Sequence, residues 1–251
     1  MFSKHIISVI VVLFSSALYA LPFESFAKYR VKYGFINLGE AAASLKIYEN
    51  GSYETKIEAK ATGFAATLSG KRVETYKSIG KVSDGILIPD SLEKIRSSNK
   101  KSKRVTYIFD HKEKQIAYFE EKCDKNDCFY SSEMLPKYVE NDILTLYHNV
   151  AFMFAKDDAK ELNASAVGSR ELVSVIMPEG KQLKTAEKLF DGAKGLYLLI
   201  VLNQNIFSSD KGELYINLDN DMTVSKAVLK DTLLFGDIWG QIVEKRVEGS
   251  R

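Results

Sequence analysis

Residues 53–61 read Tyr-Glu-Thr-Lys-Ile-Glu-Ala-Lys-Ala, and this stretch decides the fold class. Its apolar or small side chains alternate with Glu and Lys, so one side of the segment is largely apolar and the other is charged. A period of two places neighbouring residues on opposite faces of a β-strand. The stretch therefore predicts a strand with one face in a core and the other in water.

Similar alternation recurs on both sides of this stretch and predicts about a dozen strands. Asn50-Gly51 and Asp84-Gly85 are typical of tight hairpin turns between neighbouring strands. Residues 196–202 are nearly all apolar, which predicts a strand buried on both faces. The other predicted strands cover residues 28–35, 43–48, 71–79, 86–88, 104–109, 115–119, 171–177, 213–218, 223–229 and 238–243.

One segment, residues 142–154, has a helical period instead. Its apolar side chains recur at intervals of three and four, and Asn141 or Asp142 can cap the first turn. We expect an amphipathic helix that packs on the sheet. The fold prediction is therefore mainly β: an antiparallel curved sheet, half-barrel or barrel with one helix on it, in a single domain over residues 21–251.

The first twenty residues have the features of a secretory signal peptide. Lys4 gives a positive start, and residues 6–14 form an unbroken apolar run. Cleavage after Ala20 fits, and cleavage after Ala17 is the alternative. The run is shorter than the about 20 residues that a membrane-spanning helix needs. We therefore expect residues 1–20 to be removed and the mature protein to work in the bacterial periplasm.

Composition narrows the function classes further. The chain has 35 Lys and Arg against 33 Asp and Glu, without the basic excess of a dedicated nucleic-acid-binding protein. Its two cysteines, Cys123 and Cys128, lie on either side of four polar residues. Their spacing differs from the Cys-x-x-Cys of redox pairs, and no further ligands at zinc-site spacing follow. We expect a structural disulfide that closes the tip of a hairpin.

A search for catalytic or cofactor-binding motifs returns none. There is no nucleophile elbow, no zinc-protease helix and no phosphate-binding loop with correct glycine spacing. Beyond the leader the only histidines are His111, expected in solvent, and His148, expected at the polar edge of the helix. Carboxylates are plentiful, but no spacing selects a catalytic pair. The sequence therefore predicts no catalytic residue, no metal and no cofactor.

Two surface features have both a plain and a functional interpretation. Lys100, Lys101, Lys103 and Arg104 form the densest basic run; it is either a solvated hairpin loop or a contact for anionic lipid head groups. Asn163 lies in an Asn-x-Ser sequence with an acidic residue two positions before it. This extended pattern resembles the acceptor site of bacterial periplasmic N-glycosylation, and chance is the alternative.

Three stretches carry a resemblance to a known family: residues 29–41, residues 142–147 and residues 212–216 with 234–238. Together they resemble the opening strand and turn, the helix start and the closing strands of the domain-of-unknown-function 3108 (DUF3108) family of exported bacterial proteins. The resemblance implies a periplasmic β fold. It implies no reaction and transfers no functional residue.

We carry three functional hypotheses from the sequence. The first is a non-enzymatic periplasmic protein that binds a lipid or other apolar ligand in a barrel-like interior during envelope maintenance. The second is a scaffold or assembly factor that binds an envelope protein through a sheet edge or helix face. The third, an enzyme with an unrecognised carboxylate site, ranks last. An enclosed apolar cavity favours the first, and a filled interior with an exposed apolar patch favours the second.

Overall fold

The computed structural model describes residues 22–157, 161–167, 172–201, 212–220, 222–232 and 236–249; the predicted signal peptide, residues 1–20, lies outside them. Strands dominate the described part of the chain. The strands are β1 (Phe23–Tyr33), β2 (Ile36–Ile47), β3 (Ser52–Ala61), β4 (Val73–Ser83), β5 (Ile86–Ser97), β6 (Ser102–Asp110), β7 (Gln115–Cys123), β8 (Cys128–Met134), β9 (Asn141–Asp142), β10 (Glu161–Val167), β11 (Leu172–Ile176), β12 (Leu196–Val201), β13 (Glu213–Leu218), β14 (Val224–Thr232) and β15 (Gly236–Glu248). The helices are α1 (Gly63–Ser69), α2 (Ile143–Asp157) and α3 (Gly180–Leu189).

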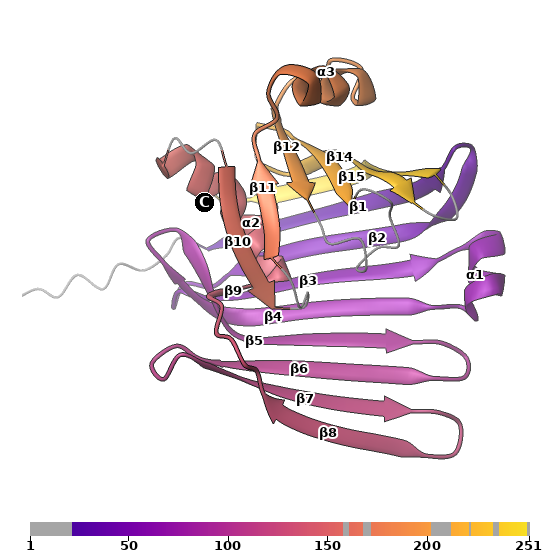
Figure 1. Cartoon of the computed structure of the whole chain (residues 1–251), viewed down its shortest axis with the longest axis vertical. Helices are drawn as coiled ribbons and strands as arrows, with labels where there is room; N and C mark the ends of the chain where they lie inside the picture. The colour runs from indigo at the N-terminus through magenta and orange to yellow at the C-terminus, as the bar shows by residue number, and fades with distance from the viewer. Residues whose placement is uncertain are drawn as a thin grey trace, which may run out of the picture.

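All these strands join one sheet in the order β8 to β1, then β15 to β9 (Figure 1). Neighbouring strands are antiparallel except β9 and β10, which are parallel. Strands β1 and β15 pair in the middle of the sheet, so the first and last strands of the chain hold its two wings together. The strands β8 and β9 stand at opposite ends of the order, and the sheet does not close into a barrel.

Helix α2 lies inside the curve of this sheet. It contacts β3, β4 and β5 on one side and β9 and β10 on the other, so the sheet wraps around it (Figure 1). Leu146 and Val150 of α2 pack against the C-terminal wing, and Leu144 packs against Leu92 and Phe109 of the N-terminal wing. We call the face that α2 contacts the inner face. These features confirm the predicted curved antiparallel sheet with an amphipathic helix.

The prediction of a single helix was wrong, because α1 and α3 were missed. Helix α1 has only seven residues, too few for a periodic pattern to be recognised. Helix α3 is rich in lysine, and its buried residue Ala186 packs with Phe190 on the outer face, against Leu199 and Tyr215. In the described ranges no helix is long and apolar enough to cross a membrane.

The local predictions around turns and strand β12 were correct. Asp84 and Gly85 have φ angles of 51° and 80°, the left-handed values that a tight hairpin turn of this kind requires. In β12, Leu198 faces the inner core and Leu199 faces α3, and both side chains are fully buried. The continuous apolar run therefore reflects a strand covered on both faces, as expected.

Candidate functional site

A buried polar network surrounds the start of helix α2 at one end of the inner face. The Asp142 carboxylate accepts hydrogen bonds from the backbone N–H groups of Leu144 (2.7 Å) and Thr145 (2.8 Å), as the cap of a helix does. Its other oxygen accepts the Ser78 hydroxyl at 2.6 Å, and Ser78 lies 3.0 Å from the hydroxyl of Tyr53. Asp142 is fully buried, and burial raises the pKa of its carboxyl despite these bonds.

Asn149 connects helix α2 to the first part of strand β5, which is not paired with β6. Strand β5 pairs with β6 only from Ser91 onward, so the earlier residues lack a strand partner on that side. The Asn149 side chain fills this position: its oxygen accepts the N–H of Leu87 at 2.9 Å, and its nitrogen donates to the Leu87 carbonyl at 2.8 Å. The same nitrogen lies 3.1 Å from the Asn141 oxygen of β9. A side-chain amide therefore stands where backbone pairing would otherwise continue.

Both histidines are held by specific bonds, which corrects two predictions. His111 is half-buried rather than solvated: its ring nitrogens lie 2.5 Å from the Tyr138 hydroxyl and 2.6 Å from the Pro89 carbonyl. His148 does not lie at the polar edge of α2; its Nε2 is 2.8 Å from the buried Thr55 hydroxyl on the inner face. We call the end of the inner face that holds the Asp142 and Asn149 network the packed end. We interpret both histidines as anchors of helix and loop, because their partners are a phenol, a carbonyl and a hydroxyl that belong to this packed end.

The other end of the inner face carries charge. Strand register places Arg96, Lys103 and Lys122 directly beside one another on β5, β6 and β7. Neighbouring strands lie about 4.8 Å apart, and like charges in directly opposite positions destabilise a sheet. Arg72 and Lys94 extend the group, which we call the basic cluster together with its two carboxylates, Glu74 and Glu120.

The two carboxylates are shared among the five cations. Glu74 accepts Arg72, Arg96 (3.1 Å) and the Tyr76 hydroxyl (2.9 Å). Burial would raise the pKa of its carboxyl, but these partners outweigh burial and lower it. Two carboxylates for five cations leave an excess of three positive charges.

Glu120 has the same role two strands away. Its side chain is only 9% exposed, and it receives Lys103, Lys122 and the Tyr118 hydroxyl. Burial opposes ionisation, yet these donors lower the pKa of Glu120 to about 2. A third carboxylate, that of Glu133, lies in the adjacent cross-strand row on the edge strand β8, where it is exposed. Glu133 reduces the local excess of positive charge but does not remove it.

Lys94 lies deepest in the basic cluster. Its ammonium is 5.2 Å from the centroid of the Tyr76 ring, a cation–π distance. Burial, and then the nearby charge of Arg96, lower the pKa of Lys94. An additional anion would relieve both effects, since it would replace lost hydration and offset the neighbouring positive charge.

An apolar strip adjoins the basic cluster on the same face. Ala59 is the direct cross-strand partner of Glu74, and Ile57 is the partner of Tyr76. On the next strand Ala41 and Ala43 continue the two rows. We call these residues the apolar floor: Ala41, Ala43, Ile57 and Ala59, all half-buried. Three of these four side chains are alanines, and none of the four is fully buried.

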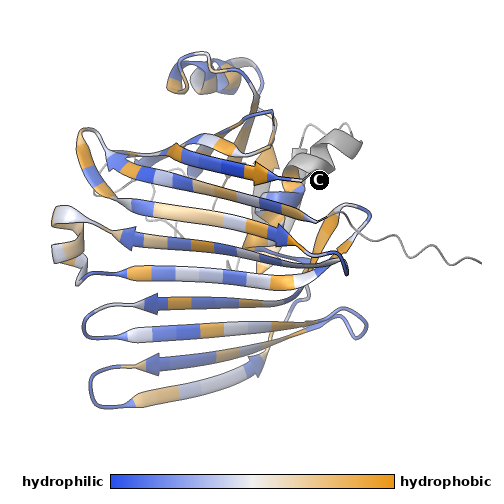
Figure 2. Ribbon diagram, turned by 180° about the vertical axis from the view of Figure 1, so that it is seen from behind, coloured by the Kyte–Doolittle hydropathy of each residue, from blue (hydrophilic) through white to orange (hydrophobic). Residues whose placement is uncertain are grey.

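The outer face of the same strands differs in charge. It carries both cations and carboxylates, and many of them are matched across strands, such as Lys77 with Glu54 at 2.9 Å and Arg104 with Glu93 at 3.4 Å. In the described part of the chain no helix lies across the outer face of β3–β8 (Figure 2). These charges include Glu54, Lys56, Glu58, Lys60, Lys77, Lys81, Glu93, Arg104, Asp110 and Glu121.

The predicted basic run does not form one surface. Lys100 and Lys101 lie in the turn between β5 and β6, while Lys103 points to the inner face and pairs with Glu120. Arg104 points to the outer face, towards Glu93 and Glu121. The sequence analysis predicted one continuous basic surface and did not identify Lys94, Arg96 or Lys122 as part of it. Their spacing of two along each strand was the available signal, but it needed the hairpin register.

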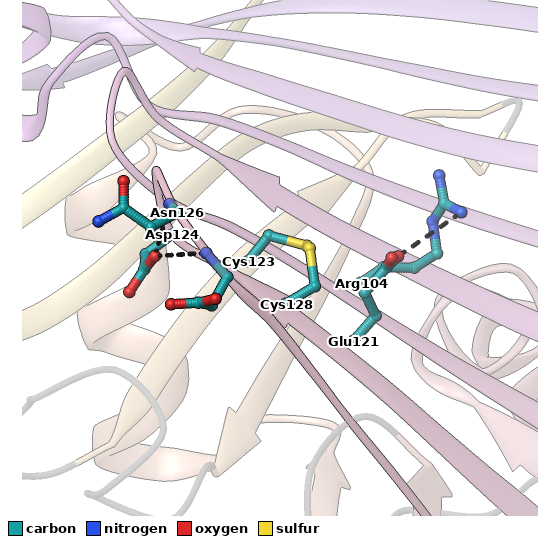
Figure 3. The surroundings of a disulfide bond; sticks show 7 residues. Arg104, Glu121, Cys123, Asp124, Asn126 and Cys128 are labelled. Carbon is teal, nitrogen blue, oxygen red and sulfur yellow. Dashed lines mark hydrogen bonds and ion pairs between the residues drawn. A yellow bond between two sulfur atoms is a disulfide. The ribbon is translucent and has the colours of Figure 1, made fainter.

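The two cysteines form the predicted disulfide at the tip of the β7–β8 hairpin (Figure 3). Asp124 orders the tip by accepting the N–H groups of Asn126 (2.9 Å) and Asp127 (3.1 Å). Ligand-type atoms of Glu121, Cys123 and Cys128 lie within 4.8 Å of one another, but both sulfur atoms are used by the disulfide. We therefore do not assign this group to a metal.

Asn163 lies in β10, paired with Ser174 of β11, and its side chain lies outside the part of the chain that the structure describes. Glycosylation at Asn163 stays a prediction.

Comparison with known proteins gives a structural similarity but no function. No family model matches the chain, and no curated protein matches it. Among solved structures, the chain is similar to a beta-barrel-like protein of domain of unknown function DUF1849 from Brucella abortus. The two are 11% identical with a TM-score of 0.47, and the match covers 93% of this chain and all of the other. The resemblance to the DUF3108 family stays a prediction.

Proposed function

We propose that this protein is a non-enzymatic binding protein of the bacterial periplasm and that its inner face holds an amphiphilic ligand with an anionic head group. The observation that carries the proposal is the direct contact between apolar floor and basic cluster on adjacent strands. An acyl chain fits the first, and a phosphate or another anion fits the second, because guanidinium and ammonium groups bind such anions strongly. The predicted leader and the disulfide support the location.

The excess of like charge is the physical argument for a ligand. Arg96 and Lys122 remain about half exposed, with side-chain exposures of 54% and 58%. A sheet that served only its own stability would alternate charges there, as the outer face of this sheet does. Stability sacrificed at one place in a fold commonly marks a functional surface.

The first test is calorimetric titration of the mature protein with dodecyl phosphate below its micelle concentration. Dodecyl maltoside supplies the same chain without charge, and inorganic phosphate supplies the charge without the chain. We expect dodecyl phosphate to bind most tightly and to weaken with added salt. Equal binding of dodecyl maltoside would remove the anionic head group from the proposal, and no binding of either detergent would contradict the proposal as a whole.

Adjacent residues of strand β6 supply a matched pair of variants. Lys103→Gln removes an inner-face cation, and Arg104→Gln removes an outer-face cation of the same hairpin. We expect the first to weaken dodecyl phosphate binding about tenfold, in line with loss of one charge-assisted hydrogen bond, and the second to change it by less than about twofold. Similar losses in both variants would show only a non-specific effect of net charge.

A second pair tests the apolar floor in the same way. Ala59→Phe fills the floor, while Glu58→Phe adds the same ring to the outer face of strand β3. Only Ala59→Phe should abolish the part of the affinity that depends on the dodecyl chain of the ligand. Native mass spectrometry of protein from its own periplasm, before and after organic extraction, would then give the mass of the natural ligand.

A second candidate function rests on strand β8. All seven of its residues are exposed, it ends the described sheet, and Phe129 and Tyr130 are 66% and 74% exposed. Such an edge favours addition of a strand from a partner protein. A photo-crosslinking residue at Ser132, compared with one at Glu58, would capture that partner; equal capture at both positions would exclude this function.

A further inference from the structure

Large apolar side chains are exposed at one end of the sheet, on the connections between strands. Phe35, in the turn between β1 and β2, is 96% exposed, and Ile36 beside it is 40% exposed. Helix α1, which connects β3 to β4, exposes Phe64 and Leu68 at 71% and 70%. Phe64 and Leu68 are four residues apart, so they lie on one side of the helix, and that side faces solvent.

Helix α1 contacts both strand β2, which follows the β1–β2 turn, and the turn between β5 and β6. The N–H of Thr62, just before α1, donates to the carbonyl of Leu38 at 3.1 Å. At the other end of α1, the Gly70 carbonyl accepts the N–H of Asn99 at 2.9 Å. Helix α1 therefore links the start of β2, just after the β1–β2 turn, to the β5–β6 turn, and all three segments lie at the α1 end of the sheet in Figure 1. We call the β1–β2 turn, α1 and the β5–β6 turn together the rim.

The rim also carries positive charge beside its apolar side chains. Lys71 follows α1, and Lys100 and Lys101 lie in the β5–β6 turn; all three are exposed. The neighbouring hairpin tip adds Asp124, Lys125 and Asp127, and these six residues together have an excess of two positive charges. Aromatic and aliphatic side chains on protruding loops, flanked by lysines, match the chemistry of a bilayer interface with anionic lipids.

We propose that the rim is a membrane-docking surface that inserts Phe35, Phe64 and Leu68 among the lipids of an anionic bilayer. The lysines at positions 71, 100 and 101 contact the lipid head groups. The basic cluster begins directly behind the rim, since Arg72 follows Lys71 and Arg96 lies two residues before Ser98 of the turn. Docking there would bring the proposed amphiphile site next to its source. The docking surface does not depend on that site.

The test is flotation of the mature protein with vesicles of phosphatidylcholine containing about a third phosphatidylglycerol, and with vesicles of phosphatidylcholine alone. We expect binding to the mixed vesicles and weaker binding to the neutral ones. Phe35→Ser and the double variant Phe64→Ser, Leu68→Ser should each weaken binding by about tenfold or more, because each removes at least one large apolar anchor. These side chains are so exposed that their loss leaves the fold intact.

The matched control is Phe129→Ser with Tyr130→Ser, which removes two exposed aromatic rings from strand β8. This control should bind vesicles as the wild type does. Loss of binding in the control but not in the rim variants would assign the contact to β8 and overturn the proposal. Absence of vesicle binding would also overturn it, and a dimer in analytical ultracentrifugation that disappears in the α1 variant would then assign the rim to a second copy of the chain.

The inner-face variant Ala59→Phe separates this proposal from the proposed function. If the rim docks independently of the amphiphile site, the Ala59→Phe variant should no longer bind dodecyl phosphate but should still bind vesicles. The α1 double variant should show the reverse. A common loss in both variants would show that the vesicles were recognised through the amphiphile site, which would overturn the rim as a separate surface.

Discussion

At one end of the inner face, Asp142 and Asn149 bury their polar groups and hydrogen-bond them to the sheet and helix α2. At the other end, five cations share two carboxylates and remain partly in water. The first arrangement uses polar groups to join a helix to a curved sheet, and each partner is supplied by the fold. The second gathers more cations than carboxylates on one face of the sheet. We infer that the first end specifies structure and the second is available for binding.

The largest expected effect lies at the packed end. Asp142→Ala removes the cap of α2 and leaves two backbone N–H groups and the Ser78 hydroxyl without their acceptor. We expect the free energy of unfolding to fall by about 2–4 kcal/mol, from the lost cap and the buried unsatisfied groups. Urea denaturation measures it, and Glu113→Ala, at an exposed turn, is the control. A loss no larger than in the control would mean that the network does not hold the helix.

Asn149→Ala should have a slightly smaller effect, about 2–3 kcal/mol, because it leaves the N–H and carbonyl of Leu87 buried without partners. Besides lowering the free energy of unfolding, the substitution should weaken the local structure around Leu87. Hydrogen exchange at the Leu87 amide should become much faster than in the wild type. The exposed Asn126→Ala variant should change neither quantity. Unchanged exchange at Leu87 would show that another group already satisfies this part of strand β5.

The sequence predicted the packed end better than the charged end, for a physical reason. Residues 53–61 and 142–154 carry periods that depend only on local geometry, and both elements formed as expected. Asp142 was recognised as a cap because capping involves neighbouring residues. Its bond to Ser78 joins residues 64 positions apart, and no local pattern contains it.

The charged end depends on strand register, which the sequence did not determine. Arg96 and Lys103 become neighbours only when Ser97 pairs with Ser102 across a tight turn. With that turn unassigned, Lys103 and Arg104 were grouped together, although strand alternation sends them to opposite faces. Strand β8 was implied only by the predicted hairpin tip at Cys123 and Cys128, and the sheet edge that it forms was not recognised.

The pH dependence of stability offers a third, smaller test of the packed end. Asp142→Asn keeps a good helix cap and can donate to Ser78, so its stability at pH 7 should lie within about 1 kcal/mol of the wild type. Burial raises the pKa of Asp142 above its ordinary value of 3.8, so the folded wild type binds this proton more tightly than the unfolded chain does. Relative to the variant, the wild type should therefore be most stable below about pH 3.8 and lose this advantage as the pH rises through the raised pKa.

Urea denaturation of both proteins between pH 3.5 and pH 7 measures this difference. Glu74 and Glu120, whose pKa values are lowered, lose their stabilising contribution as the pH falls, but they do so in both proteins and cancel. A wild-type advantage that grows towards neutral pH would contradict the direction assigned to Asp142.

The smallest expected effect is a rise in the free energy of unfolding, whereas the Ala variants of Asp142 and Asn149 lower it. Lys94→Met gives up the cation–π contact with Tyr76, but it removes a cation whose charged form is disfavoured by burial and by Arg96. We expect the free energy of unfolding to rise by a few tenths of a kcal/mol at low salt, and the gain to shrink as salt screens the cluster. Lys77→Met on the outer face, which breaks the ion pair with Glu54, should lower stability slightly or leave it unchanged.

These two variants decide what kind of surface the basic cluster is. If Lys94→Met stabilises the protein and abolishes dodecyl phosphate binding, then the fold retains Lys94 at a cost, as expected of a ligand-binding residue. If Lys94→Met destabilises the protein as a broken ion pair would, the cations balance one another through contacts within the sheet. The charged end would then belong to the architecture, as Asp142 and Asn149 do, and the ligand would have to be sought at the rim or along strand β8.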